Sequence, residues 1–263
     1  MALVALLIAV GLVAATLYAL RGGLVGRGHV LTFAGFDANA ALMGVLAVAA
    51  AVYFYSPIYG IALILSVMIH EFGHVAAFRV CGHSDARFRL IPLMGGVAIS
   101  NQAPASQEKQ FFITLMGPAI CLAPMALCMA LLEFEAVYSS PAVDLIWAFA
   151  VVTGSLNFFN LMPFWPLDGG RIVSVLLRTF LPGAVTQATM AMAAASIVLA
   201  IYSQSMLFLA FALMAAQNLV MRGDVGQVQR PMGKGRGALA LAAYLATTAA
   251  FGLTGWPLLA SFF

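Results

Sequence analysis

The chain consists of long apolar stretches separated by short polar segments, and this pattern limits what it can fold into. Of its 263 residues, 63% are hydrophobic and only 8% are charged, whereas about a quarter of the residues of an ordinary soluble domain are charged. An apolar helix of about 20 residues is long enough to cross a bilayer. We therefore expect an all-α polytopic membrane protein without a large extramembrane domain.

Apolar runs that begin and end at charged residues, Gly or Pro predict eight membrane spans. The boundaries at Ser56-Pro57 and Ser203-Gln204 carry the weakest signals, so a count of seven is the alternative. The expected spans cover approximately residues 1–20, 39–55, 58–80, 111–132, 143–163, 185–203, 205–221 and 238–258.

The basic residues indicate how these spans are oriented, because Lys and Arg are retained on the cytoplasmic side during insertion. All twelve lie after, or at the end of, the first, third, fifth or seventh span, and the opposite connections carry none. We therefore expect both termini outside and the basic loops in the cytosol. This bias also explains the net charge of +3, so we expect no nucleic-acid partner. The twelve residues are Arg21, Arg27, Arg79, Arg87, Arg89, Lys109, Arg171, Arg178, Arg222, Arg230, Lys234 and Arg236.

The first apolar segment differs from a secretory signal peptide, because its positive charges follow the apolar run instead of preceding it. We expect it to be an uncleaved membrane anchor.

The third expected span contains an HExxH motif, which runs from His70 through Glu71 to His74. Residues four apart lie on one face of a helix, so both imidazoles can reach one metal ion while Glu71 projects beside it as a general base. A charged residue in the middle of a bilayer costs about 2.5 kcal/mol or more and is normally retained only for function. The motif therefore predicts a zinc site with His70 and His74 as ligands.

A catalytic zinc ion typically has three protein ligands, so one more is required. His29 and His83 lie in polar segments with Gly neighbours, where a solvated loop histidine is the usual state, and we favour neither. The better candidate is Asp168, immediately past the fifth expected span.

The segment that carries Asp168 is able to turn back into the helix bundle. Pro163 and Pro166 prevent a continuous helix, and Gly169 and Gly170 permit unusual dihedral angles. The competing interpretation is that Asp168 caps an amphipathic helix over 169–180. Topology favours the metal ligand, because the third and fifth spans run in the same direction and place both motifs in the cytoplasmic half.

Taken together, the two motifs resemble the signature of the site-2 protease family of intramembrane zinc metalloproteases. The family's HExxH and NxxPxxxLDG motifs are matched in order and on separate spans. Between them, Gly95-Gly96 looks like the family's Gly-Gly segment, and Gly117-Pro118 looks like the start of its GPxxN motif, with Cys121 where many members carry Asn. The second signature is matched by Asn160, Pro163, Leu167, Asp168 and Gly169.

The resemblance implies a six-helix protease core over residues 39–221 with a short membrane-associated β-hairpin. Residues 1–38 would be an N-terminal transmembrane anchor with a cytoplasmic loop, and residues 222–263 a cytoplasmic loop with a C-terminal transmembrane helix. No insertion large enough for a PDZ domain and no CBS domain is evident.

The resemblance also implies one catalytic Zn²⁺ on His70, His74 and Asp168, with Glu71 as the catalytic base. Asn160 is expected to position the substrate backbone. The 86–100 region is expected to pair with an unwound substrate strand. The residues expected to contact the substrate are Asn160, Pro163, Gly95 and Gly96.

The expected activity is hydrolysis of peptide bonds in or near transmembrane segments of membrane proteins, as in regulated intramembrane proteolysis. The expected partners are a transmembrane-helix protein substrate, membrane lipid and a regulatory membrane protein. The expected location is a prokaryotic inner membrane, with the active site toward the cytoplasm. The alternatives are another membrane zinc hydrolase and a non-catalytic metal-binding membrane protein.

Overall fold

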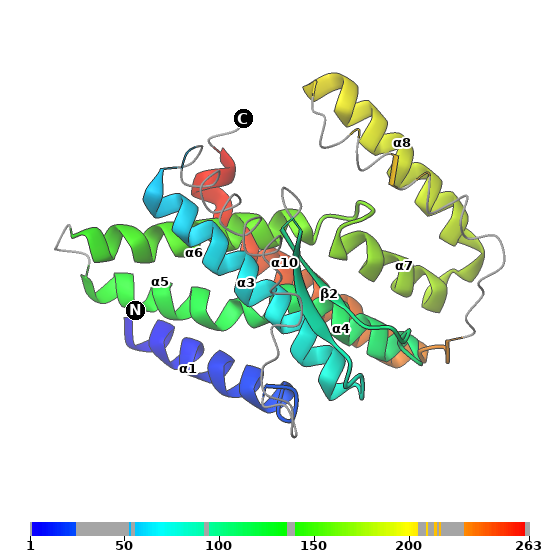
Figure 1. Ribbon diagram of the computed structural model, residues 1–263, viewed down its shortest axis with the longest axis horizontal. Coiled ribbons are helices and arrows are strands. Elements are labelled where there is room, and N and C mark those ends of the chain that lie inside the picture. The colour runs from blue at the N-terminus through cyan, green and yellow to red at the C-terminus, as the bar shows by residue number, and fades with distance from the viewer. Residues whose placement is uncertain are drawn as a thin grey trace. The chain divides into compact units, whose positions relative to one another are not determined.

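The computed structural model describes most of the chain and is largely helical (Figure 1). The described residues are 2–24, 56–91, 95–135, 140–204 and 229–260, with Tyr53, Leu209, Leu213, Met214 and Ala216 as isolated positions. Most of the expected spans at 39–55 and 205–221, and His29, lie outside these residues, so the number of spans stays a prediction. The helices are α1 (Ala2–Ala19), α3 (Pro57–Val80), α4 (Gln107–Ile120), α5 (Leu122–Glu135), α6 (Pro141–Asn160), α7 (Asp168–Phe180), η1 (Pro182–Ala184), α8 (Val185–Ser203) and α10 (Lys234–Leu259).

Within the described ranges, six helical stretches are long and apolar enough to cross a membrane. Each coincides with an expected span to within a few residues. The fourth expected span is divided between α4 and α5, which meet at Cys121. Pro124 lies one turn after this break, and it has no N–H to bond the carbonyl of Ile120 while its ring clashes with that carbonyl, so a continuous helix is disfavoured. The described part therefore has the architecture of a polytopic, mostly helical membrane protein. The six stretches are Ala2–Ala19, Pro57–Val80, Gln107–Phe134, Pro141–Asn160, Pro182–Tyr202 and Lys234–Leu259.

The chain forms two compact units, and each unit draws on separate parts of the sequence. The first unit comprises Met1–Ala103, Met116–Phe158 and Thr247–Phe263. The second comprises Pro104–Leu115 and Phe159–Ala246.

In the first unit, α3 and α6 lie side by side and run in the same direction. The hydroxyl of Ser66 donates to Thr153 Oγ1 at 3.0 Å. One turn further along both helices, His70 Nδ1 lies 2.7 Å from Asn157 Oδ1. Both pairs are separated by 87 residues, so the partners advance together, as they do between parallel helices. The prediction that these two spans share one direction is confirmed.

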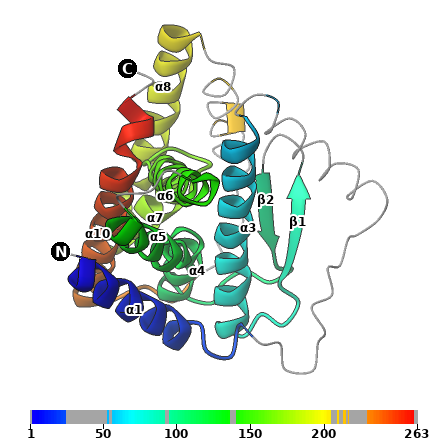
Figure 2. The same ribbon diagram turned by 90° about the vertical axis from the view of Figure 1, so that its left-hand side faces the viewer.

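An antiparallel pair of strands packs beside α3 in the same unit (Figure 2). Strand β1 (Arg87–Ile91) pairs with β2 (Gly95–Ile99) in a register that sets Arg87 opposite Ile99 and Ile91 opposite Gly95. Helix α1 packs along α5 on another side of the unit. Within the first unit, α3 therefore packs against helix α6 and against the β1–β2 strand pair.

In the second unit, the start of α4 lies beside the segment that leads into α10. Residues Ser106 and Arg230 form a parallel β-bridge. The side-chain oxygen Oε1 of Gln107 accepts hydrogen bonds from the backbone N–H of Met232 at 2.8 Å and from the Thr179 hydroxyl at 3.1 Å. One buried amide therefore joins α4, α7 and the approach to α10.

Candidate functional site

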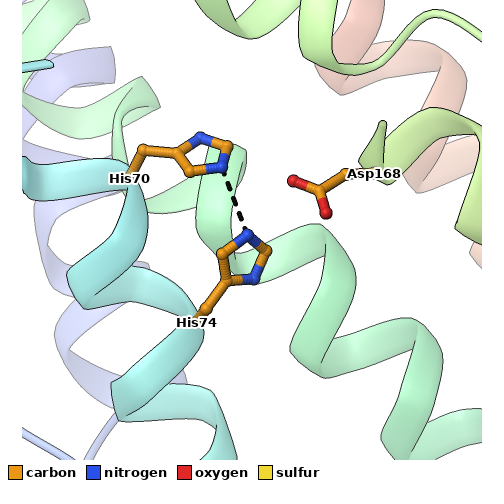
Figure 3. Close-up of side chains that lie close together, drawn as sticks. All are labelled: His70, His74 and Asp168. Carbon is orange, nitrogen blue, oxygen red and sulfur yellow. Dashed lines mark hydrogen bonds between the residues drawn. The ribbon is translucent and has the colours of Figure 1, made fainter. Parts of the chain in front are cut away.

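Helix α3 presents the two motif histidines from one face, as their spacing predicts (Figure 3). His70, Glu71 and His74 are all buried, with 3%, 9% and 7% of their surfaces exposed. The Nε2 atoms of the two imidazoles lie 3.2 Å apart. Two nitrogens bound to one zinc ion at about 2.0–2.1 Å in tetrahedral geometry would be about 3.3 Å apart. The two rings are therefore spaced as a shared divalent ion requires.

The Nδ1 atom of His70 is held by Asn157. Its partner, at 2.7 Å, is the amide oxygen Oδ1, which can only accept a hydrogen bond. The orientation of the amide follows from its nitrogen, which donates to the carbonyl of Thr153 at 2.8 Å. Nδ1 of His70 therefore carries the proton, and Nε2 offers its lone pair toward His74.

Asn157 was not among the residues predicted for the site. It is fully buried within α6. Its sequence signal is a polar amide side chain within a predicted membrane span, where polar groups are costly and usually functional. Its pairing with His70 depends on the contact between α3 and α6.

Gly117 of α4 leaves the space that His74 occupies. A Cβ atom at this position would lie 2.2 Å from Nε2 of His74. A Cβ at Gly73, within the motif itself, would lie 2.2 Å from the carbonyl oxygen of Met116. Helix α4 therefore approaches the histidine face of α3 closely, and only glycines permit this approach.

Asp168 belongs to the second unit, where it is the first residue of α7. Its side chain is buried, and the amide of Asn160 donates to its Oδ2 at 3.3 Å. Arg171 lies one turn along, with Nη1 3.9 Å from Oδ1. The N-cap position of α7 is held by Leu167, so the alternative in which Asp168 caps this helix is not what the structure contains.

Gly169 and Gly170 were expected to adopt unusual dihedral angles, and this expectation is wrong. Neither residue is among the glycines with positive φ in the described part of the chain, so no unusual dihedral angle is used. Instead, a Cβ at Gly169 would lie 2.1 Å from the carbonyl oxygen of Leu161. A Cβ at Gly170 would lie 2.5 Å from the carbonyl oxygen of Phe164. The two glycines allow the turn after α6 to pack against the start of α7.

The remaining predicted residues lie on three different elements. Asn160 is the last residue of α6, and Pro163 is exposed in the turn that follows it. Gly95 and Gly96 are the first two residues of β2 and pair with β1.

His83 was expected to be a solvated loop histidine, and this expectation is wrong. Its ring is buried against Phe78, with the ring centroids 5.2 Å apart. Its Nδ1 lies 2.9 Å from the hydroxyl oxygen of Ser100, and that hydroxyl donates to Asp85 Oδ1 at 3.0 Å. Burial of this histidine is tolerated because Ser100 gives its Nδ1 a hydrogen-bond partner.

The donor types and their burial suit a divalent metal ion. His70, His74 and Asp168 are buried, and each offers one ligand atom, either an imidazole nitrogen or a carboxylate oxygen. Zinc takes both types of ligand at catalytic sites. The residues present therefore fit such an ion.

Comparison with known proteins points to one family. The sequence pattern of Peptidase family M50 matches residues 58–139 and 128–203, which together make up more than half of the chain. Putative zinc metalloprotease Rip3 of Mycobacterium tuberculosis is 35% identical over 119 residues, which is 44% of this chain and 30% of that protein. Stage IV sporulation protein FB of Bacillus subtilis is 28% identical over 122 residues, which is 46% of this chain and 41% of that protein. The alignments therefore span less than half the length of either relative.

Among solved structures, the chain is similar to the Site-2 Protease from Methanocaldococcus jannaschii. The TM-score is 0.46 at 20% sequence identity, over 73% of this chain and 92% of that one.

Proposed function

Because the chain belongs to peptidase family M50, we propose that it is an intramembrane zinc metalloprotease. It would hydrolyse peptide bonds in or near the transmembrane segments of other membrane proteins, as in regulated intramembrane proteolysis. The observation that carries this proposal is the pair of buried imidazoles on α3, with Nε2 atoms 3.2 Å apart and one ring fixed by Asn157. Glu71 lies between the two histidines in the sequence and is also buried. Its carboxylate is proposed as the base that hydrolysis needs.

One Zn²⁺ ion is proposed to bind to His70, His74 and Asp168, the three buried residues that each offer one ligand atom. Three protein ligands leave a fourth position for water or substrate, as catalytic zinc sites require. The hydrogen bond from Asn160 to Asp168 supports this assignment, because carboxylates that bind a metal are commonly oriented by a second hydrogen bond. Asn160 would therefore orient the ligand and, as the family resemblance implies, contact the substrate backbone.

When bound, the zinc ion would polarise the scissile carbonyl and make a water molecule acidic. Glu71 would then accept the proton of that water and pass it to the leaving amine. Asn157 would keep the proton of His70 on Nδ1, so that Nε2 stays available as a ligand. Burial of all three motif residues of α3 would limit access of bulk water.

The substrate is proposed to be a transmembrane helix that unwinds and pairs with the β1–β2 strands. Among the described residues this sheet has two strands, and an extended peptide can add to the outer edge of a strand. Gly95 and Gly96 at the start of β2, and Pro163 in the turn after α6, are proposed as contacts. Proline substitutions across residues 93–99 should abolish cleavage, and full cleavage by all of them would contradict the pairing.

The proposed core is residues 39–221, which contains the matched residues 58–203. The chain is proposed to reside in a prokaryotic inner membrane with its active site toward the cytoplasm and both termini outside. Membrane lipid surrounds the spans in this arrangement. A regulatory membrane protein is proposed as a further partner.

The proposal can be tested by co-expressing candidate single-span membrane proteins with the wild type and with Glu71→Gln. The wild type should cleave a substrate, the variant should not, and a zinc chelator should abolish the wild-type cleavage. Glu133→Gln makes the same chemical change at an exposed position of α5 and should cleave normally. If no substrate is cleaved in a way that depends on Glu71 and is sensitive to the chelator, the proposal is rejected, and a non-catalytic metal-binding protein is favoured.

A further inference from the structure

Helix α10 contacts the turn between α6 and Asp168, although this helix lies beyond the residues that match the family. The hydroxyl of Tyr244, near the middle of α10, donates to the carbonyl oxygen of Leu161 at 2.6 Å. Only 7% of the Tyr244 surface is exposed. A segment outside the family match therefore makes a short, buried hydrogen bond to a residue within a signature motif.

The carbonyl of Leu161 needs such a partner. It follows the last residue of α6, and the carbonyl groups at the end of a helix have no donor within that helix. Leu161 is fully buried, so water is a poor substitute. A buried carbonyl without a donor is destabilising, and the Tyr244 hydroxyl supplies the donor.

The same carbonyl lies directly against the start of α7. Its oxygen occupies the space where a Cβ of Gly169 would be, at 2.1 Å. Gly169 follows Asp168 in the chain, and both residues are buried. A shift of the Leu161 carbonyl would therefore displace the first turn of α7 and the Asp168 carboxylate with it.

We propose that Tyr244 is a positioning residue through which helix α10 fixes the location of the Asp168 carboxylate. The inference rests on the proposed function, in which Asp168 is a metal ligand. It gives the C-terminal helix a part in the active site: Tyr244 holds the Leu161 carbonyl, the carbonyl abuts Gly169, and Gly169 adjoins the ligand.

The test is the affinity of the purified full-length protein for Zn²⁺, measured by competition with a chromogenic chelator, together with thermal unfolding. Tyr244→Phe removes only the hydroxyl and should weaken zinc binding about tenfold, at the low end of the effect of residues that orient metal ligands. Ser155→Ala is the matched control, because the Ser155 hydroxyl makes another hydrogen bond to α10, to the carbonyl of Gly255 at 3.0 Å. This control should lower the unfolding temperature without weakening zinc binding.

Three other results would overturn the inference. Wild-type affinity in Tyr244→Phe, with weakened binding in Asp168→Ala, would reject the role of Tyr244 and leave the proposed function intact. Equal losses in Tyr244→Phe and Ser155→Ala would reduce Tyr244 to a stabilising contact of α10. Wild-type affinity in Asp168→Ala would reject the proposed metal site, and the role of Tyr244 with it.

Discussion

A histidine that binds a metal ion inside a membrane must have its other ring nitrogen committed to a partner. In His70 this partner is Asn157, whose own amide nitrogen is held by the backbone of Thr153. Because the donor and acceptor are both fixed, the imidazole has one tautomer and one orientation.

We expect Asn157→Ala to weaken zinc binding about 10–100-fold, because His70 would lose the group that orients it. Ser196→Ala is a suitable control, since Ser196 is a buried polar residue of α8 whose hydroxyl donates to the carbonyl of Met192 in the same helix. Chelator competition measures both. Equal affinity of Asn157→Ala and the wild type would contradict the orienting role.

The space beside His74 gives a second prediction for a single residue. Gly117→Ala would place a Cβ 2.2 Å from His74 Nε2, so either the ring or helix α4 has to move. Overpacking of this kind costs about 1–3 kcal/mol, and we expect both zinc affinity and cleavage to fall. In Gly11→Ala the new Cβ would meet nothing within 4 Å, so that variant should match the wild type. An unchanged zinc affinity in Gly117→Ala would contradict the close approach of α4.

For single residues, the sequence predicts the expected metal ligands better than the residues that orient them or leave space for them. The spacing of His70 and His74 fixes a shared helix face without any tertiary information. The roles of Asn157 and Gly117 could not be predicted, because each depends on which helix packs against α3. Gly169 was singled out for its dihedral freedom, but a glycine is needed there because a Cβ would clash with the Leu161 carbonyl. That clash depends on how the chain packs, which the neighbouring sequence does not show.

Among the elements, helix positions and directions follow from apolar length and charge placement. The expected 185–203 span coincides with α8, and the shared direction of α3 and α6 follows from where basic residues cluster. The division of the fourth expected span at Cys121 was missed, although Pro124 carried a signal for it. Average hydropathy does not register a break that leaves the apolar run intact.

A network of polar side chains joins the residues just before β1 to the residues just after β2. Asp85, just before β1, accepts hydrogen bonds from the backbone N–H of Asn101 at 2.6 Å and from the Ser100 hydroxyl at 3.0 Å. The bond from Asn101 is the main reason that the pKa of Asp85 is lowered from its ordinary value of 3.8, and the Ser100 hydroxyl adds to the effect. His83 joins the network through Ser100.

This network predicts how the strand pair responds to acid. A lowered carboxylate pKa means that Asp85 stabilises the folded pair at any pH above its ordinary value, and that this contribution is lost as the pH falls through the lower folded value. We expect the amide of Asn101 to exchange more slowly in the wild type than in Asp85→Asn at pH near 7. The difference should disappear as the pH falls through the lowered pKa of Asp85. Protection factors from hydrogen exchange measure it, and equal protection at neutral pH would contradict the role of Asp85.

For the whole molecule, the distribution of Lys and Arg predicts one orientation in the membrane. We expect single cysteines placed at each terminus of a cysteine-free variant to react with a membrane-impermeant thiol reagent added from outside. A cysteine at Lys234, before α10, should react only after the membrane is permeabilised. Labelling of Lys234→Cys in intact cells would reverse the predicted orientation.

The whole-molecule level is also where sequence reasoning reaches least far. The six apolar stretches could be predicted, because hydropathy is a local property. The division into two units could not, since each unit combines distant segments such as Met116–Phe158 and Thr247–Phe263. The contact of Tyr244 with Leu161 joins residues 83 apart and has no local signal.

The most direct test of the central claim is the zinc content of the purified chain and its variants. Wild type and Glu71→Gln should each contain about one zinc ion per chain, since Glu71 is proposed as the base and not as a ligand. His70→Ala and Asp168→Ala should contain far less, and only the wild type should cleave. A full zinc content and normal cleavage in Asp168→Ala would contradict the account.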